Sequence, residues 1–191
     1  MELILLGIYS FIVWLIFFKY RLLPWNTISQ VIVITIPVIG LTLLILLLNI
    51  VAPDILFLGQ KDYQQFVLMQ RMIAELRLPL ELRMGPTLRE PDGLAMSSRN
   101  RYLDAAERSR APALHAALVK VREQLLAGAR DFAQLTAAAR AALEHAGFRP
   151  DYVEIRRQRD LGAAEPQRAE PWIVLGAARL GRTRLIDNLF V

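Results

Sequence analysis

The stretch PDILFLGQKDYQQ at residues 53–65 decides how the second part of this chain folds. Its apolar run Ile55–Leu58 ends at Gly59, a pattern that predicts a short buried strand followed by a tight turn. The run from Lys61 to Leu78 then places apolar side chains on one helical face, namely Phe66, Met69, Ile73 and Leu76. A strand, a glycine turn and a helix in this order bring a helix N-terminus to where it can meet an anion.

Two interpretations of this turn remain open from its residues alone. Lys61 can meet a phosphate as a point charge, and Asp62 can hold a sugar hydroxyl. Asp62 can equally cap the helix, with Lys61 as an ordinary surface lysine.

The next segment carries a second group of polar side chains. A second strand, Leu80–Met84, leads into a loop, Gly85–Asn100, with a turn at Pro91-Asp92-Gly93. The end of this loop reads Met96-Ser97-Ser98-Arg99-Asn100, which supplies hydroxyls, a guanidinium and an amide within five residues. Such a set suits a polyphosphate, and the alternative is a plain polar loop. With the first strand and helix, this segment predicts a partial Rossmann-like, nucleotide-binding α/β half over residues 54–103.

The remaining residues, 104–191, predict a small α+β domain. Asp104 and Glu107 form a capping-box pattern that opens a helix running to about Ala127, with Pro112 as an early interruption, and Gly128 ends it. A second helix runs from Asp131 to Gly147. Three alternating runs then predict a three-stranded antiparallel sheet packed on the two helices, with a hairpin turn at residues 180–182: Tyr152–Arg156, Trp172–Ala178 and Thr183–Asn188.

Residues 1–53 are of a different kind, since their only charged side chains are Glu2, Lys19 and Arg21. Two uncharged runs, Leu3–Phe18 and Val31–Ala52, predict a transmembrane helical hairpin and a two-span membrane protein. A secretory signal peptide fits poorly, because Glu2 replaces the usual basic residues and no small-residue cleavage site follows. The basic connector favours a cytoplasmic loop with both termini outside, but Lys61 and Arg71 weaken that bias, so the side of the soluble part stays open.

Composition narrows the function classes. The chain has no cysteine, which excludes disulfides and thiol chemistry. The chain has 23 basic and 18 acidic residues, of which two basic residues and one acidic residue lie in residues 1–53. The rest of the chain therefore has a net charge of +4. These charges are interspersed, so no nucleic-acid partner is expected. His115 and His145 lack a metal-ligand partner at helical spacing and are expected to be plain helix-surface residues.

Three long motifs resemble the C-terminal part of pantothenate synthetases over residues 53–191. They are the stretch at residues 53–65, the loop from Arg89 to Leu103, and the closing segment ARLGRTRLIDN at residues 178–188. Residues 1–53 are similar to the two-span N-terminal segment of envelope secretion-adaptor (membrane fusion) proteins.

The resemblance implies an ATP-dependent ligase that joins pantoate to β-alanine through a pantoyl adenylate, assisted by Mg²⁺. It implies catalytic or phosphate-binding roles for Lys61, Ser97, Ser98 and Arg99. It also implies that Asp62 holds the ribose and Gln65 contacts pantoate, while Gly59, Leu88 and Met96 line the nucleotide pocket.

The N-terminal nucleotide-binding half of that family, with its His-x-Gly-His motif, is not found in these residues. The chain is therefore expected to be inactive alone, as a fusion of two unrelated segments, and its open strand edges are expected to favour self-association. The alternative is a non-catalytic, membrane-anchored protein or a secretion-adaptor remnant.

Overall fold

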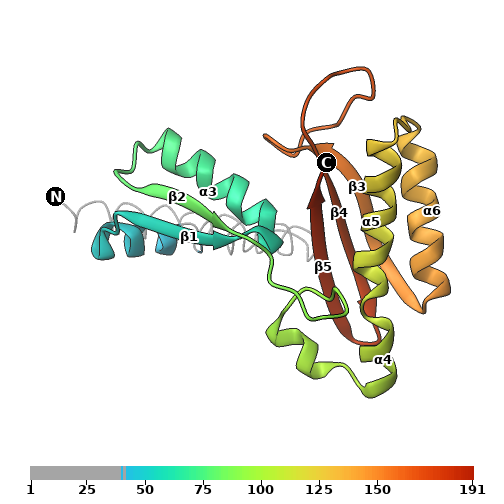
Figure 1. The fold of residues 1–191 in the computed structure, drawn as a ribbon. Coiled ribbons are helices and arrows are strands. Elements are labelled where there is room, and N and C mark those ends of the chain that lie inside the picture. The colour runs from blue at the N-terminus through green and yellow to red at the C-terminus, as the bar shows by residue number, and fades with distance from the viewer. Residues whose placement is uncertain (1–39, 41) are drawn as a thin grey trace, which may run out of the picture. The chain divides into compact units, whose positions relative to one another are not determined.

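The computed structural model describes residue 40 and residues 42–191 of the chain (Figure 1). It divides into two compact units, Met1–Pro53 and Asp54–Val191. The expected further boundary near residue 103 stays a prediction.

In the first unit, residues 42–51 are helical. Within the described residues, no helix combines the length and the apolar character needed to cross a bilayer. The first predicted span, Leu3–Phe18, the connector and residues 31–39 and 41 of the second span lie outside the described residues. The membrane hairpin therefore stays a prediction.

The second unit opens with the predicted strand–turn–helix–strand. Strand β1 (Ile55–Gly59) is followed by a 3-10 turn, η1 (Gln60–Asp62), and by helix α3 (Tyr63–Glu75). Strand β2 (Glu81–Gly85) returns parallel to β1, in a register that pairs Ile55 with Glu81 and Gly59 with Gly85. The predicted α/β arrangement is confirmed for this segment, and the helix begins two residues later than expected because η1 occupies its first turn.

The predicted helix from residue 104 to about residue 127 is two helices. A 3-10 helix, η2 (Ser98–Tyr102), leads to α4 (Ala105–Arg110), which opens with the expected capping box between Asp104 and Glu107. Helix α5 (Ala113–Leu126) starts after Pro112, because proline has no N–H to continue the α4 ladder. Helix α6 (Phe132–His145) begins after Asp131, whose side chain caps Gln134 N–H.

The three-stranded antiparallel sheet is confirmed, in the order β3-β4-β5. Its strands are β3 (Phe148–Arg157), β4 (Trp172–Leu180) and β5 (Thr183–Phe190). Strand β3 is longer than expected and has an irregularity between Pro150 and Tyr152. The β4–β5 connection is the predicted tight hairpin, with Gly181 at a φ of 54°.

The two faces of this sheet carry separate apolar clusters. Helices α5 and α6 cover one face, where Leu118 and Leu143 are fully buried and burial of each side chain contributes about 1.5–3 kcal/mol. Packing is close enough that a Cβ on Gly176 would lie 2.9 Å from Leu118 Cδ2. Helix α3 packs on the other face through Tyr63, Phe66 and Val67, against Ile173 and Leu175.

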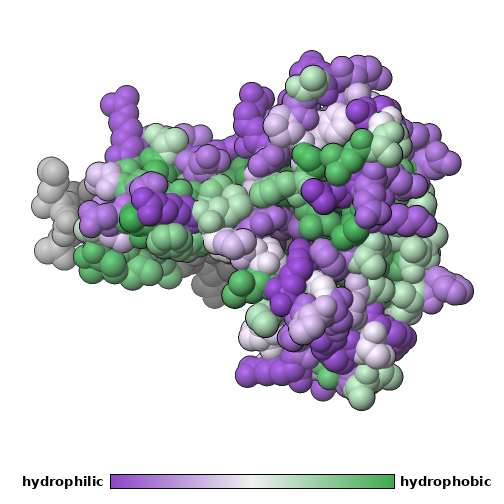
Figure 2. All heavy atoms as spheres, viewed as in Figure 1, coloured by the Kyte–Doolittle hydropathy of each residue, from purple (hydrophilic) through white to green (hydrophobic). Residues whose placement is uncertain are grey.

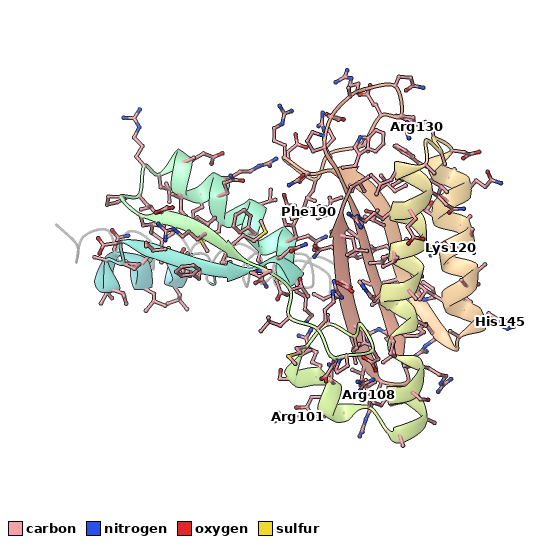
Figure 3. All side chains as sticks on the ribbon, in the orientation of Figure 1. Arg101, Arg108, Lys120, Arg130, His145 and Phe190 are labelled. Atoms are coloured by element: carbon pink, nitrogen blue, oxygen red, sulfur yellow. The ribbon has the colours of Figure 1, made fainter. Side chains whose placement is uncertain are left out.

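Phe190, labelled in Figure 3, helps to join α3 to the sheet, since its ring meets that of Tyr63 edge-on with centroids 5.3 Å apart. The parallel strand–helix–strand segment is thus held to the antiparallel sheet by a shared apolar contact. The turn after β1 lies against β5.

Candidate functional site

A pocket forms where the turn after β1, the loop before α4 and strand β5 meet. Its charged and polar lining comes from segments far apart in the sequence, and the lining side chains belong to Lys61, Leu94, Ala95, Ser97, Arg99, Asn100, Leu114, His115, Arg184, Leu185, Ile186 and Asp187. The two predicted phosphate-binding segments, the Lys61 turn and the loop with Ser97 and Arg99, therefore line the same pocket.

The turn that carries Lys61 is held by a buried amide on β5. The Asn188 side chain, 1% exposed, donates from Nδ2 to the carbonyl oxygens of Gln60 and Lys61, each at 2.9 Å. Its Oδ1 lies 3.4 Å from Gln60 Nε2, which donates to it. All three hydrogen bonds of this side chain thus go to the turn.

The loop that carries Ser97 and Arg99 is anchored by an ion pair between the partly exposed Arg89 and the buried Asp187. Arg89 donates from both terminal nitrogens to the carboxylate of Asp187, at 2.7 and 2.9 Å, and also to the carbonyl of Gly93 at 3.0 Å. Asp187 is only 4% exposed, so this bidentate pair is screened little by water.

The predicted turn at Pro91-Asp92-Gly93 is confirmed. An isolated bridge pairs Arg89 with Ala95, and Glu90 N–H donates to the carbonyl of Leu94 at 2.8 Å. Gly93 has a φ of 90°, which a residue with a Cβ rarely adopts, and a Cβ there would lie 2.8 Å from the ring of His115. The turn is therefore shaped to lie against α5.

Ser97, Arg99 and Asn100 are presented by the start of η2. The Ser97 hydroxyl oxygen accepts from Arg99 N–H at 3.2 Å, and Asn100 Nδ2 donates to the carbonyl of Ala95 at 3.1 Å. These local bonds place a hydroxyl and a guanidinium at the pocket on a short, hydrogen-bonded turn.

His115 departs from the sequence expectation of a plain surface residue. It lines the pocket, and its Nδ1 lies 3.3 Å from Asp187 Oδ2. Burial and the nearby Arg89 guanidinium lower the pKa of His115, and the Asp187 carboxylate offsets part of that decrease. The ring is therefore neutral near neutral pH, in keeping with its place beside an existing Arg–Asp pair.

The pocket carries a surplus of positive charge. In the described part of the chain, neither the Lys61 nor the Arg99 side chain has an acidic partner within ion-pair distance, while Arg184 donates to Asp151 at 2.6 Å. That hydrogen bond raises the pKa of Arg184. Two unpaired cations at one depression attract anions. Hydrophilic residues dominate the surface around neighbouring α4 (Figure 2).

The other predicted site residues lie outside the lining of this pocket. Gly59 ends β1, Ser98 begins η2, and Gln65 is exposed on α3. Asp62 is exposed and occupies the N-cap position of α3, as one interpretation expected, but its side chain makes no capping hydrogen bond. Leu88 and Met96 are neighbours, because Met96 N–H donates to the carbonyl of Leu88 at 2.9 Å, and both are exposed. Their binding roles stay predictions.

Sequence reasoning assigned no role to Arg89, His115, Asp187 or Asn188. Arg89, Asp187 and Asn188 lie in the motifs that resemble pantothenate synthetases, and that resemblance was the signal that could have pointed to them. Their partners are 98 and 128 residues distant in the chain, so no local pattern pairs them. As for metals, no group of three or more His, Asp or Glu side chains in the described range is arranged to hold an ion.

The fold and the pocket define an α/β protein with a cationic pocket at the carboxyl ends of its parallel strands. Residues 40–190 match the sequence model of the pantoate-beta-alanine ligase family, and the chain belongs to that family.

Several relatives are similar over the same region. The chain is 51% identical to the pantothenate synthetase of Thiobacillus denitrificans over 150 residues, which are 78% of this chain and 53% of that protein. It is 54% identical to that of Halorhodospira halophila over 145 residues, 75% and 50% of the two chains. The chain thus spans about half the length of the curated relatives that it matches.

Two solved structures of this family are similar to the chain in fold. The pantothenate synthetase of Thermus thermophilus aligns with a TM-score of 0.68 at 39% identity, over 76% of this chain and 52% of that one. The pantoate-beta-alanine ligase of Francisella tularensis, complexed with beta-gamma ATP and beta-alanine, aligns with a TM-score of 0.53 at 29% identity, over 78% and 48%.

The lowered pKa of His115 predicts a loss of stability on mild acidification. Below the ordinary value of 6.5, the unfolded chain takes up this proton more readily than the folded chain. The stability due to the neutral ring is therefore complete above that pH and is lost as the pH falls through it towards the lower folded-state pKa. Urea midpoints at pH 7.5 and 5.5 should differ less in His115→Gln than in the wild type. His145→Gln, an exposed change on α6, should keep the wild-type difference; an unchanged difference in His115→Gln would contradict the assignment.

Proposed function

We propose that residues 54–191 form the ATP-phosphate side of a pantoate–β-alanine ligase site. The observation that carries the proposal is the convergence of Lys61, Ser97 and Arg99 on one cationic pocket. Membership of the family supports it, and so does the Francisella tularensis relative, whose structure holds an ATP compound and β-alanine.

In the proposed reaction, the carboxylate of pantoate attacks the α-phosphorus of ATP and releases pyrophosphate, and the amine of β-alanine then displaces AMP from the pantoyl adenylate. Negative charge develops on the departing pyrophosphate. Lys61 and Arg99 would stabilise that charge, and Ser97 and Ser98 would donate hydroxyl hydrogen bonds to phosphate oxygens.

The other roles follow the family pattern. Asp62, exposed beside Lys61 and free of a capping bond, would accept from the ribose hydroxyls. Gly59, Leu88 and Met96 would border the nucleotide, and Gln65 would contact pantoate.

Mg²⁺ would enter with the nucleotide. The pocket offers cations and a single carboxylate, Asp187, already paired with Arg89. These residues fit a Mg²⁺ ion held mainly by phosphate oxygens and water, which is the usual mode for this metal with nucleotides.

Mg-ATP should protect the loop of residues 85–100 from chymotrypsin, which cleaves after exposed residues such as Leu88. Lys61→Ala and Arg99→Ala should each raise the ATP concentration for half-protection by roughly 10- to 100-fold, since each deletes a charge-assisted contact. Neither change alters a chymotrypsin site.

Two control variants each remove one lysine or arginine charge outside the pocket. Lys120→Ala on α5 (Figure 3) and Arg140→Ala on α6 are exposed changes outside the pocket and should leave protection at the wild-type level. Equal cleavage with and without nucleotide in the wild type would instead support the plain polar-loop interpretation.

We further propose that this 191-residue chain by itself does not make pantothenate. It spans about half of each relative that it matches, and the groups described above would contact the nucleotide from one side only. A loss of two transition-state contacts of about 3 kcal/mol each would lower the rate by roughly four orders of magnitude.

A complementation test checks this. Expressed at a level confirmed by immunoblot, the chain should not restore growth without pantothenate to a strain that lacks its own synthetase. Growth that Lys61→Ala abolishes would show that the chain is a complete catalyst.

Residues 1–53 are proposed to hold the chain in a bilayer as two spans, on the strength of their sequence alone. The chain should then stay in the membrane pellet after alkaline carbonate extraction. Replacing Ile12 and Leu44 by Arg should move it towards the supernatant, because each charge costs roughly 2.5–3.5 kcal/mol at the centre of a span. Release of the unmodified chain would contradict the two spans.

A further inference from the structure

We propose that Asp187 and Asn188, adjacent on β5, are positioning residues that hold the two phosphate-binding segments in register with each other. The inference rests on the proposed ATP site and adds to it two residues that would not touch the nucleotide. They would act through the Lys61 turn and through the loop that ends in Ser97 and Arg99.

The two residues can do this because neighbouring side chains of a strand point to opposite faces. Leu185 and Leu189 pack in the cluster beneath α5, and Phe190 packs in the cluster beneath α3. Asp187 accordingly meets Arg89 and the α5 residue His115, while Asn188 meets the turn that precedes α3. One strand thus reaches one phosphate-binding segment on each side.

Asn188 is suited to the turn by its chemistry. A single amide nitrogen supplies two hydrogens, and both are used, on the carbonyls of Gln60 and Lys61 at 2.9 Å. These two carbonyl oxygens are thereby engaged with β5 and cannot point at an anion beside Lys61, where their dipoles would repel it. A buried side chain with all its groups satisfied also fixes one geometry of the turn.

Asp187 performs the equivalent task for the loop. Its two oxygens accept the Arg89 fork, and Oδ1 also accepts from Asn188 N–H at 2.8 Å, which orients the carboxylate. Arg89 forms the bridge with Ala95, two residues before Ser97. The start of η2 is therefore tied to Asp187, the residue next to the one that holds the Lys61 turn.

Asn188→Asp is the sharpest test, because it keeps the size of the side chain but places a carboxylate oxygen against two carbonyl oxygens. At pH 7.5, amide hydrogen exchange over residues 60–66 should rise about tenfold while residues 173–180 exchange as in the wild type. The Mg-ATP concentration for half-protection of the loop should rise about tenfold as well. At pH 5, burial favours the protonated carboxyl, which can donate once, so the ratio of variant to wild type should fall.

Two further variants keep the outcome decisive. Asn188→Ser retains one small neutral donor and should show the same local effects in weaker form, even where Asn188→Asp disturbs the whole sheet. Thr183 is buried on the same strand, and its hydroxyl has no hydrogen-bond partner among the described residues. Thr183→Val should leave both the exchange of residues 60–66 and ATP protection unchanged.

The two proposals fail in different ways. Absence of ATP protection in the wild type would overturn the proposed function, and the exchange measurement would still decide whether Asn188 holds the turn. Wild-type ATP affinity in Asn188→Asp and Asn188→Ser, with or without faster exchange, would overturn the positioning role. Faster exchange throughout β4 and β5 in both variants would overturn it in favour of a purely structural one.

Discussion

The site depends on a buried polar pair in the last strand of an otherwise apolar sheet. Asp187 and Asn188 are both less than 5% exposed, and every neighbour that satisfies them belongs to a segment of the candidate site or to the strand itself. Buried polar groups are costly when unpaired, so the sheet tolerates these two only with the turn and the loop in place. The hydrogen bonds that keep this part of the core satisfied are therefore the same ones that set the geometry of the pocket.

Local chemistry explains which elements could be predicted from the sequence. Gly59 after an apolar run marked the end of β1, the Asp104–Glu107 pair marked the start of α4, and Gly93 and Gly181 marked turns that have positive φ. Each of these signals acts through residues within a few positions of one another. The resemblance to the ligase family implied phosphate-binding roles for Lys61, Ser97 and Arg99, and the structure brings all three to one pocket.

The remaining features arise from contacts that no local pattern encodes. Asp187 meets Arg89 across 98 positions, and Asn188 meets the Lys61 turn across 127. His115 was expected at the surface because it has no metal-ligand partner at helical spacing, yet the turn at Gly93 lies against its ring. The packing of α3 on the second face of the sheet could not be predicted either. It depends on Ile173 and Leu175 of β4, a strand that is apolar on both faces, so its sequence does not show which element covers each face.

The same long separations impose an order on assembly. During synthesis the Lys61 turn leaves the ribosome well over a hundred residues before the amide that fixes it. At about 5–20 residues per second, that interval lasts on the order of ten seconds. Over this time β1, α3 and β2 can pair among themselves, but the carbonyls of Gln60 and Lys61 must bond to water. Closure of so long a loop is slow, so the site forms as one of the last events of folding, when β5 adds to the sheet.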